Sequence, residues 1–125
     1  MADPLPTTAN PSLRLLVLRT RQLERLRDFF RPLGVTFTPE RHGTGPLHYA
    51  GEVGGVVLEL YPLPEAARPD DHLTRLGFSV RDLASALHEF EAAGVAVVSG
   101  ARETEWGLRA VVRDPDGRTV ELYQD

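Results

Sequence analysis

The sequence predicts an α+β domain built from two tandem units, each with the order strand, helix and three strands (βαβββ). Apolar residues at spacings of three and four mark two helices, short apolar runs mark strands, and the whole order occurs twice. Shifting the chain by 60 places Phe30 on Phe90 and Gly34 on Gly94. After the second hairpin loop, which is two residues longer, the offset becomes 62, and Glu-Leu-Tyr at 59–61 falls on Glu-Leu-Tyr at 121–123.

The first unit is expected over residues 13–62. Its elements in chain order are a strand at 13–19, a helix at 23–33, and strands at 35–38, 47–53 and 56–61. The strand at 35–38 should stop at Pro39, because proline has no N–H to donate to a sheet. Gly54-Gly55 is typical of a two-residue hairpin turn and should join the last two strands.

The second unit is expected over residues 73–125. Its elements are a strand at 76–80, a helix capped by Asp82 and ended by Gly94, and strands at 95–98, 108–113 and 118–123. Asp114-Pro115-Asp116-Gly117 fits a type I turn that closes a four-residue hairpin loop. Residues 1–12 read as a flexible N-terminal arm and residues 63–72 as a linker within one structural domain.

Composition excludes several classes of function. All 14 basic residues are arginine and are scattered, and the net charge of −4 argues against nucleic acid as the main partner. No apolar run approaches the roughly 18–20 residues of a membrane span, so no membrane partner is expected. The absence of cysteine excludes thiolate metal sites and thiol nucleophiles. The start of the sequence does not resemble a signal peptide, and we expect a cytoplasmic protein.

Strand alternation predicts which side chains share a face. A turn at Gly54-Gly55 sets Glu59 opposite Ala50 and Tyr61 opposite His48, so these four share a face with Val57. In the second hairpin, a four-residue loop without a bulge would place a second set on one face: Leu108, Ala110, Val112, Thr119, Glu121 and Tyr123. The two glutamates then occupy equivalent faces of the two units.

The two βαβββ units, the second ending in Asp-Pro-Asp-Gly-Arg-Thr-Val-Glu-Leu at 114–122, resemble the vicinal-oxygen-chelate superfamily. That superfamily includes glyoxalase I, extradiol dioxygenases and the fosfomycin- and bleomycin-resistance proteins. The resemblance covers about residues 13–124. It implies a curved mixed sheet around a cavity with the helices outside, and a homodimer. The sequence leaves open whether each cleft forms within one chain or across two.

The resemblance also implies where a metal would bind. Metal enzymes of this superfamily take one ligand from the first and one from the last strand of each unit. Glu59 and Glu121 match the last-strand positions, but Leu15 and Arg75 stand at the first-strand positions, and neither is a plausible ligand. We therefore expect no cofactor and a Glu59–Arg75–Glu121 cluster in place of the ion. A relocated ion site of His48, Glu59 and Glu121 is the alternative.

The resemblance to bleomycin-resistance proteins predicts binding of a small molecule. The expected ligand-binding residues are His48, Glu59, Tyr61, Arg75, Glu121 and Tyr123. His42 could line the mouth of the cavity, and Trp106 could form a wall or cover a sheet edge. One alternative is a glyoxalase-like lyase, isomerase or dioxygenase with a nonstandard metal site, in which Glu121 would be the general base. Another is a non-catalytic structural or partner-binding dimer. The ligand cannot be identified from these spacings.

Overall fold

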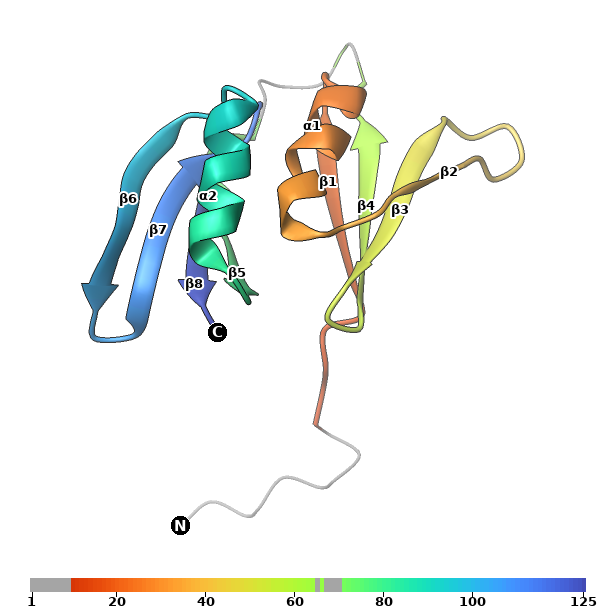
Figure 1. Cartoon of the computed structure of the whole chain (residues 1–125). Helices are drawn as coiled ribbons and strands as arrows, with labels where there is room; N and C mark the ends of the chain where they lie inside the picture. The colour runs from red at the N-terminus through yellow and green to blue at the C-terminus, as the bar shows by residue number, and fades with distance from the viewer. Residues whose placement is uncertain (1–9, 65, 67–70) are drawn as a thin grey trace.

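The computed structural model describes residues 10–64, 66 and 71–125. The elements of the first unit are β1 (Leu15–Thr20), α1 (Leu23–Phe29), the 3₁₀ helix η2 (Arg31–Leu33), β2 (Thr38–Glu40), β3 (His48–Val53) and β4 (Val56–Pro62). Those of the second are β5 (Leu76–Val80), α2 (Leu83–Ala92), β6 (Val97–Thr104), β7 (Gly107–Arg113) and β8 (Thr119–Gln124). The α+β class and the tandem βαβββ order are confirmed (Figure 1).

Some expected segments fall outside this description. Most of the expected arm, residues 1–9, and residues 65 and 67–70 of the expected linker are not described. In the part of the chain that is described, no helix has the length and apolar character needed to cross a membrane.

The strands form two four-stranded sheets with the same connectivity. Sheet A has the order β1-β4-β3-β2 and sheet B the order β5-β8-β7-β6. In each, the first strand pairs in parallel with the last strand of its unit, and Val17 lies beside Glu59 just as Gly77 lies beside Glu121. The repeat therefore places the two glutamates at equivalent positions.

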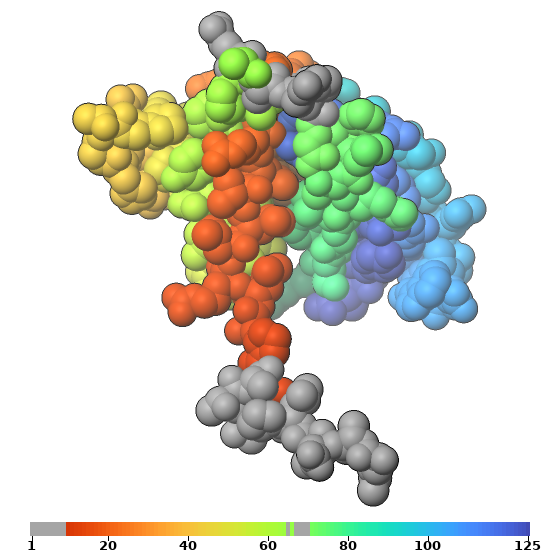
Figure 2. All heavy atoms as spheres, turned by 180° about the vertical axis from the view of Figure 1, so that it is seen from behind, coloured from red at the N-terminus to blue at the C-terminus, as the bar shows by residue number. Residues whose placement is uncertain are grey.

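One hydrophobic core joins the two units. The rings of Phe29 in α1 and Phe90 in α2 have centroids 5.1 Å apart, and Phe30 lies 5.9 Å from Phe78 of β5. Figure 1 shows the two helices next to each other in front of the sheets, and Figure 2, seen from behind, shows mainly strands. The helices thus cover one face of each sheet, and Glu59 and Glu121 lie on the opposite faces, which we call the outer faces.

The helix ends follow their sequence signals. Helix α1 stops at Phe29, Pro32 lies in the following 3₁₀ turn, and Gly34 ends that turn with a φ of 79°. At the start of α2, the Asp82 side chain accepts a hydrogen bond from the Ser85 N–H at 3.0 Å. The predicted N-cap is confirmed.

The predicted end of the third element of the first unit is wrong. Strand β2 does not stop at Pro39 but spans it, and Pro39 pairs with Tyr49 of β3. Because β2 is the edge strand of sheet A, the missing N–H of proline can face away from the sheet. The consequence is that Glu40 lies directly opposite His48.

The predicted register of the second hairpin is also wrong by one residue. Gly117 adopts a φ of 88° and donates to the Asp114 carbonyl, and Asp114 in turn donates to the Arg118 carbonyl, each at 3.0 Å. This is a type I turn followed by a left-handed glycine, which inserts one extra residue as a bulge. Arg113 therefore pairs with Thr119, and Val111 rather than Ala110 lies opposite Glu121.

The corrected register changes which side chains share the face of Glu121. The predicted companions Leu108, Ala110 and Val112 lie on the helix-covered face, where Ala110 and Val112 are fully buried in the core. In their place, Arg109 and Val111 share the outer face of sheet B with Glu121.

Candidate functional site

The outer face of sheet A holds a stacked pair of rings. His48 is 1% exposed, and its ring lies parallel to that of Tyr61 with centroids 4.1 Å apart. Nδ1 of His48 lies 3.2 Å from the carbonyl oxygen of Pro46, which can only accept, so Nδ1 carries the proton of this hydrogen bond. In the neutral ring, Nε2 is then an acceptor, and the Tyr61 hydroxyl lies 3.3 Å from it.

Glu59 lies beside this pair. One of its carboxylate oxygens, Oε2, is 3.6 Å from Nε2 of His48, and its side chain is 17% exposed. Within the described part of the chain, no arginine lies within ion-pair distance of Glu59. The guanidinium of Arg19 lies instead over the ring of Tyr61, 5.3 Å from the centroid. Glu59 is therefore a mostly buried carboxylate without a strong cationic partner.

Glu121 has the opposite surroundings. Its Oε1 accepts from Nη2 of Arg75 at 2.8 Å and also from Nη2 of Arg109. Burial alone would raise the pKa of Glu121, but hydrogen bonds and charge attraction from Arg109 and Arg75 outweigh burial and lower that pKa below its usual value. The guanidinium of Arg109 also lies 5.9 Å from the ring centroid of Tyr123.

The structure thus divides the six predicted ligand-binding residues into two groups, one on each sheet. His48, Glu59 and Tyr61 contact one another on sheet A. Arg75 and Glu121 contact each other on sheet B, and Tyr123 lies on the same face, opposite Arg109. The expected three-membered cluster is not formed, because Arg75 pairs with Glu121 only, as far as the described residues show. Whether either group binds a ligand remains a prediction.

Arg109 is not among the residues predicted from the sequence, because the predicted hairpin register turned it toward the helices. The signal that could have found it is Gly117, because a glycine directly after a type I turn favours a bulge that shifts the register by one.

His42, expected at the mouth of the cavity, lies with its ring centroid 5.1 Å from that of His48. Trp106 is 72% exposed in the turn between β6 and β7.

The residues do not fit the four-ligand metal site of the metal-dependent relatives. Leu15 offers no donor atom and is 50% exposed, and the cationic side chain of Arg75 is bound to Glu121. The relocated site is not assembled either. His48 and Glu59 approach each other, but in the described residues Glu121 forms no cluster of possible metal ligands with them.

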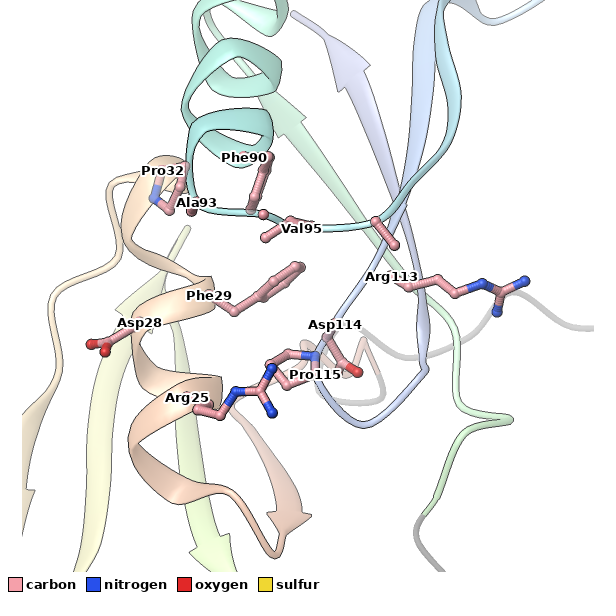
Figure 3. Close-up of a pocket in the computed structure, with 12 residues that line it drawn as sticks. Arg25, Asp28, Phe29, Pro32, Phe90, Ala93, Val95, Arg113, Asp114 and Pro115 are labelled. Atoms are coloured by element: carbon pink, nitrogen blue, oxygen red, sulfur yellow. The ribbon is translucent and has the colours of Figure 1, made fainter.

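A hollow of about 370 Å³ lies on the helix side, between α1, the end of α2 and the turn from β7 to β8 (Figure 3). Phe29 and Phe90 form its apolar floor, and Arg25, Asp28 and Arg113 are among its polar lining. None of the six predicted ligand-binding residues lines it. It is a second candidate place for a ligand, separate from the outer faces.

The two outer faces carry net charges of opposite sign. Sheet A has the acids Glu40, Glu52 and Glu59 on its outer face, with one arginine, Arg19. Sheet B and the residue before it have the arginines Arg75, Arg102 and Arg109, with one acid, Glu121. Exposed apolar side chains, Leu15 at 50% and Val57 at 40%, lie on the same face of sheet A as the acids.

Two tandem βαβββ units, with a glutamate on the uncovered face of each last strand, define a glyoxalase-type protein. The family model described as Glyoxalase/Bleomycin resistance protein/Dioxygenase superfamily matches residues 12–122. The chain belongs to this superfamily.

Solved structures share this fold. TnmS3, an antibiotic binding protein from Streptomyces sp. CB03234, is 24% identical with a TM-score of 0.71, covering 93% of this chain and 97% of its own. An integron cassette protein from V. Pseudocholerae, VPC_CASS1, is 27% identical with a TM-score of 0.65, covering 90% and 93%. Oxidase ChaP-H2 is 17% identical with a TM-score of 0.73, covering 92% and 94%. A comparison with the curated proteins gave no match.

Proposed function

We propose that this protein binds a small molecule on the outer face of sheet A, without the four-ligand metal site of the metal-dependent relatives. The ligand presents a cation or a hydrogen-bond donor to Glu59 and a flat surface to the stacked rings of His48 and Tyr61. The observation that carries the proposal is the state of Glu59, which is mostly buried and lacks a guanidinium partner among the described residues.

The contact between the ligand and Glu59 should be strong for a single polar contact. A carboxylate held away from water gains from an opposite charge, and a hydrogen bond to a charged group contributes about 1.5–3 kcal/mol. Glu121 offers much less, because Arg75 and Arg109 already occupy its Oε1. The site on sheet A is therefore the one that favours a cationic ligand.

The protein is also proposed to form a homodimer through these faces. The acids on sheet A and the arginines on sheet B are complementary, so that sheet A of one copy can face sheet B of the other about a two-fold axis. Such an association would cover Leu15 and Val57 and close each binding cleft across two chains. The proposed dimer would form the enclosed cavity that the resemblance to the superfamily implies.

The relatives support binding as a hypothesis and leave the ligand open. TnmS3 is described as an antibiotic binding protein, but its identity of 24% establishes the fold alone. The enzyme alternative has less support in this site. A lowered pKa makes Glu121 a weak general base near neutral pH, and its carboxylate is held by two arginines. A cytoplasmic location stays a prediction from composition.

The experiment is a thermal-shift screen of aromatic and aliphatic amines and cationic antibiotics. A ligand that binds the folded state raises the melting temperature of the wild type. The shift should be lost in Glu59→Gln and kept in the control Glu89→Gln, which removes an exposed acid from α2. An equal shift in Glu59→Gln would remove Glu59 from the site. A screen in which no compound raises the melting temperature of the wild type would count against the proposal.

A further inference from the structure

Three side chains with metal-binding atoms meet at the edge of sheet A where β2 pairs with β3. Glu40 and His48 are direct cross-strand partners, and His42 lies in the loop between them. A hydrogen bond of 2.9 Å from the Gly45 N–H to the His42 carbonyl closes a turn in this loop, with Gly43 at a φ of 57°. The turn folds the loop back, so that the rings of His42 and His48 lie 5.1 Å apart.

The two distances from Glu40 to the histidines are longer than direct hydrogen bonds and match the spacing of ligand atoms around an ion. Oε2 of Glu40 lies 3.4 Å from Nε2 of His48 and 3.5 Å from Nε2 of His42, beyond the usual hydrogen-bond range of about 2.7–3.2 Å. The three possible ligand atoms all lie within 4.8 Å of one another. Zinc bonds of about 2.0–2.2 Å in a tetrahedron separate neighbouring ligand atoms by roughly 3.3–3.6 Å.

The buried histidine provides a second, independent observation. Because Nδ1 of His48 donates to Pro46, Nε2 presents its electron pair to its other neighbours, which are the Tyr61 hydroxyl at 3.3 Å and the carboxylates of Glu40 and Glu59 at 3.4 and 3.6 Å. A metal ion placed between this electron pair and the carboxylates would be attracted by the nitrogen and by both carboxylates. The contact to a backbone carbonyl is also the usual way in which a metal-binding histidine is oriented.

We propose that Glu40, His42 and His48 bind a divalent ion of the zinc class. Two imidazoles and one carboxylate form a ligand set typical of zinc, whereas Mg²⁺ and Ca²⁺ prefer oxygen ligands throughout. Three protein ligands leave a fourth position for solvent or a bound molecule, and Glu59 is a second carboxylate close to it. This site lies on β2, β3 and their loop and shares no residue with the first- and last-strand positions of the family's metal enzymes.

The test is a zinc titration of the tag-free, full-length protein, with ZnCl₂ as the only ligand and a chromophoric chelator as competitor. The wild type should bind one equivalent. His42→Ala and Glu40→Gln should each weaken the affinity about tenfold or more, because each removes a direct ligand. Both side chains are at least 39% exposed, so these variants should fold. The control His88→Ala removes an exposed histidine from α2 and should bind like the wild type.

Replacement of zinc by Co²⁺ gives a geometric readout, since tetrahedral Co²⁺ absorbs visible light far more strongly than octahedral Co²⁺. Strong absorption that is lost in His42→Ala supports the site. The proposed site is overturned if His42→Ala and Glu40→Gln both bind zinc with the affinity of the wild type. It is also overturned if the wild type binds no zinc. This failure is separable from failure of the proposed function, because the ligand-induced thermal shift depends on Glu59 and should persist in His42→Ala without added metal.

Discussion

Arg118 donates a hydrogen bond from Nη2 to the backbone carbonyl of Arg19, 99 positions earlier in the chain, at 2.6 Å. The Arg118 side chain is 1% exposed, and its Nη1 also donates to Asp114 at 2.9 Å and to Asp116 at 3.0 Å. The turn formed by Asp-Pro-Asp-Gly at 114–117 is therefore connected to β1 of the first unit. Its aspartates neutralise the arginine that makes the connection.

We expect Arg118→Met to destabilise the protein by about 3–5 kcal/mol, because it leaves Asp114 and Asp116 buried without a partner charge. Urea denaturation followed by circular dichroism measures the loss. The control Arg31→Met removes a surface ion pair whose arginine is 75% exposed and should cost less than about 1 kcal/mol. Similar losses for both variants would show that the buried connection does not stabilise the fold.

Gly117→Ala should cost about 1–2 kcal/mol, because a residue with a Cβ is strained at a φ of 88°. Crowding adds little, since the nearest atom to a Cβ at this position would be 3.5 Å away. Gly100→Ala is the matched control, with open space around the added carbon and no left-handed backbone. Equal stability of Gly117→Ala and Gly100→Ala in urea denaturation would contradict the bulged turn.

Much of the fold could be predicted because its signals are local. Gly54-Gly55 does form the first hairpin turn, with φ of 54° and 85°, and pairs Ala50 with Glu59 as expected. Asp82 caps its helix. The repeat placed Glu59 and Glu121 correctly at equivalent positions, since each lies beside the first strand of its own unit.

The features that could not be predicted depend on the backbone conformation at single residues. The bulge at Gly117 decides whether Arg109 or Ala110 shares a face with Glu121, and a shift of one residue exchanges all faces. The passage of β2 through Pro39 likewise depends on its being an edge strand, which only the assembled sheet reveals. This passage brings Glu40 to His48, so the cluster at that edge had no signature in the spacing of the sequence.

The ion pairs of Glu121 should make stability depend on pH in a defined direction. Its pKa in the folded protein lies below the unfolded value, so the pairs with Arg109 and Arg75 stabilise the protein above the unfolded pKa. This contribution is lost as the pH falls through the folded pKa. Glu121→Gln should remove this part of the acid sensitivity in pH-dependent urea denaturation. NMR titration should show the pKa of Glu121 rising in Arg109→Met. A pKa that stays where it is in this variant would contradict the assigned pairing.

The proposed dimer should respond to charge. Sedimentation of the wild type should show a dimer that weakens as salt rises, because salt screens attraction between the acidic and basic faces. Arg102→Glu places a like charge against the acidic face and should raise the dimer dissociation constant by about tenfold or more. Arg81→Glu, an exposed charge beyond the end of β5, is the control. A monomer at all salt concentrations would refute the association.

Ligands should bind at His48, Glu59 and Tyr61 rather than in the hollow on the helix side. Backbone and side-chain NMR shifts, recorded while a stabilising cationic ligand from the screen is added, test this directly. The largest changes in chemical shift are expected at these three residues and their neighbours on β3 and β4. Changes centred instead on Phe29, Phe90 and the turn from β7 to β8 would place the ligand in the hollow and rule out binding on the outer face of sheet A.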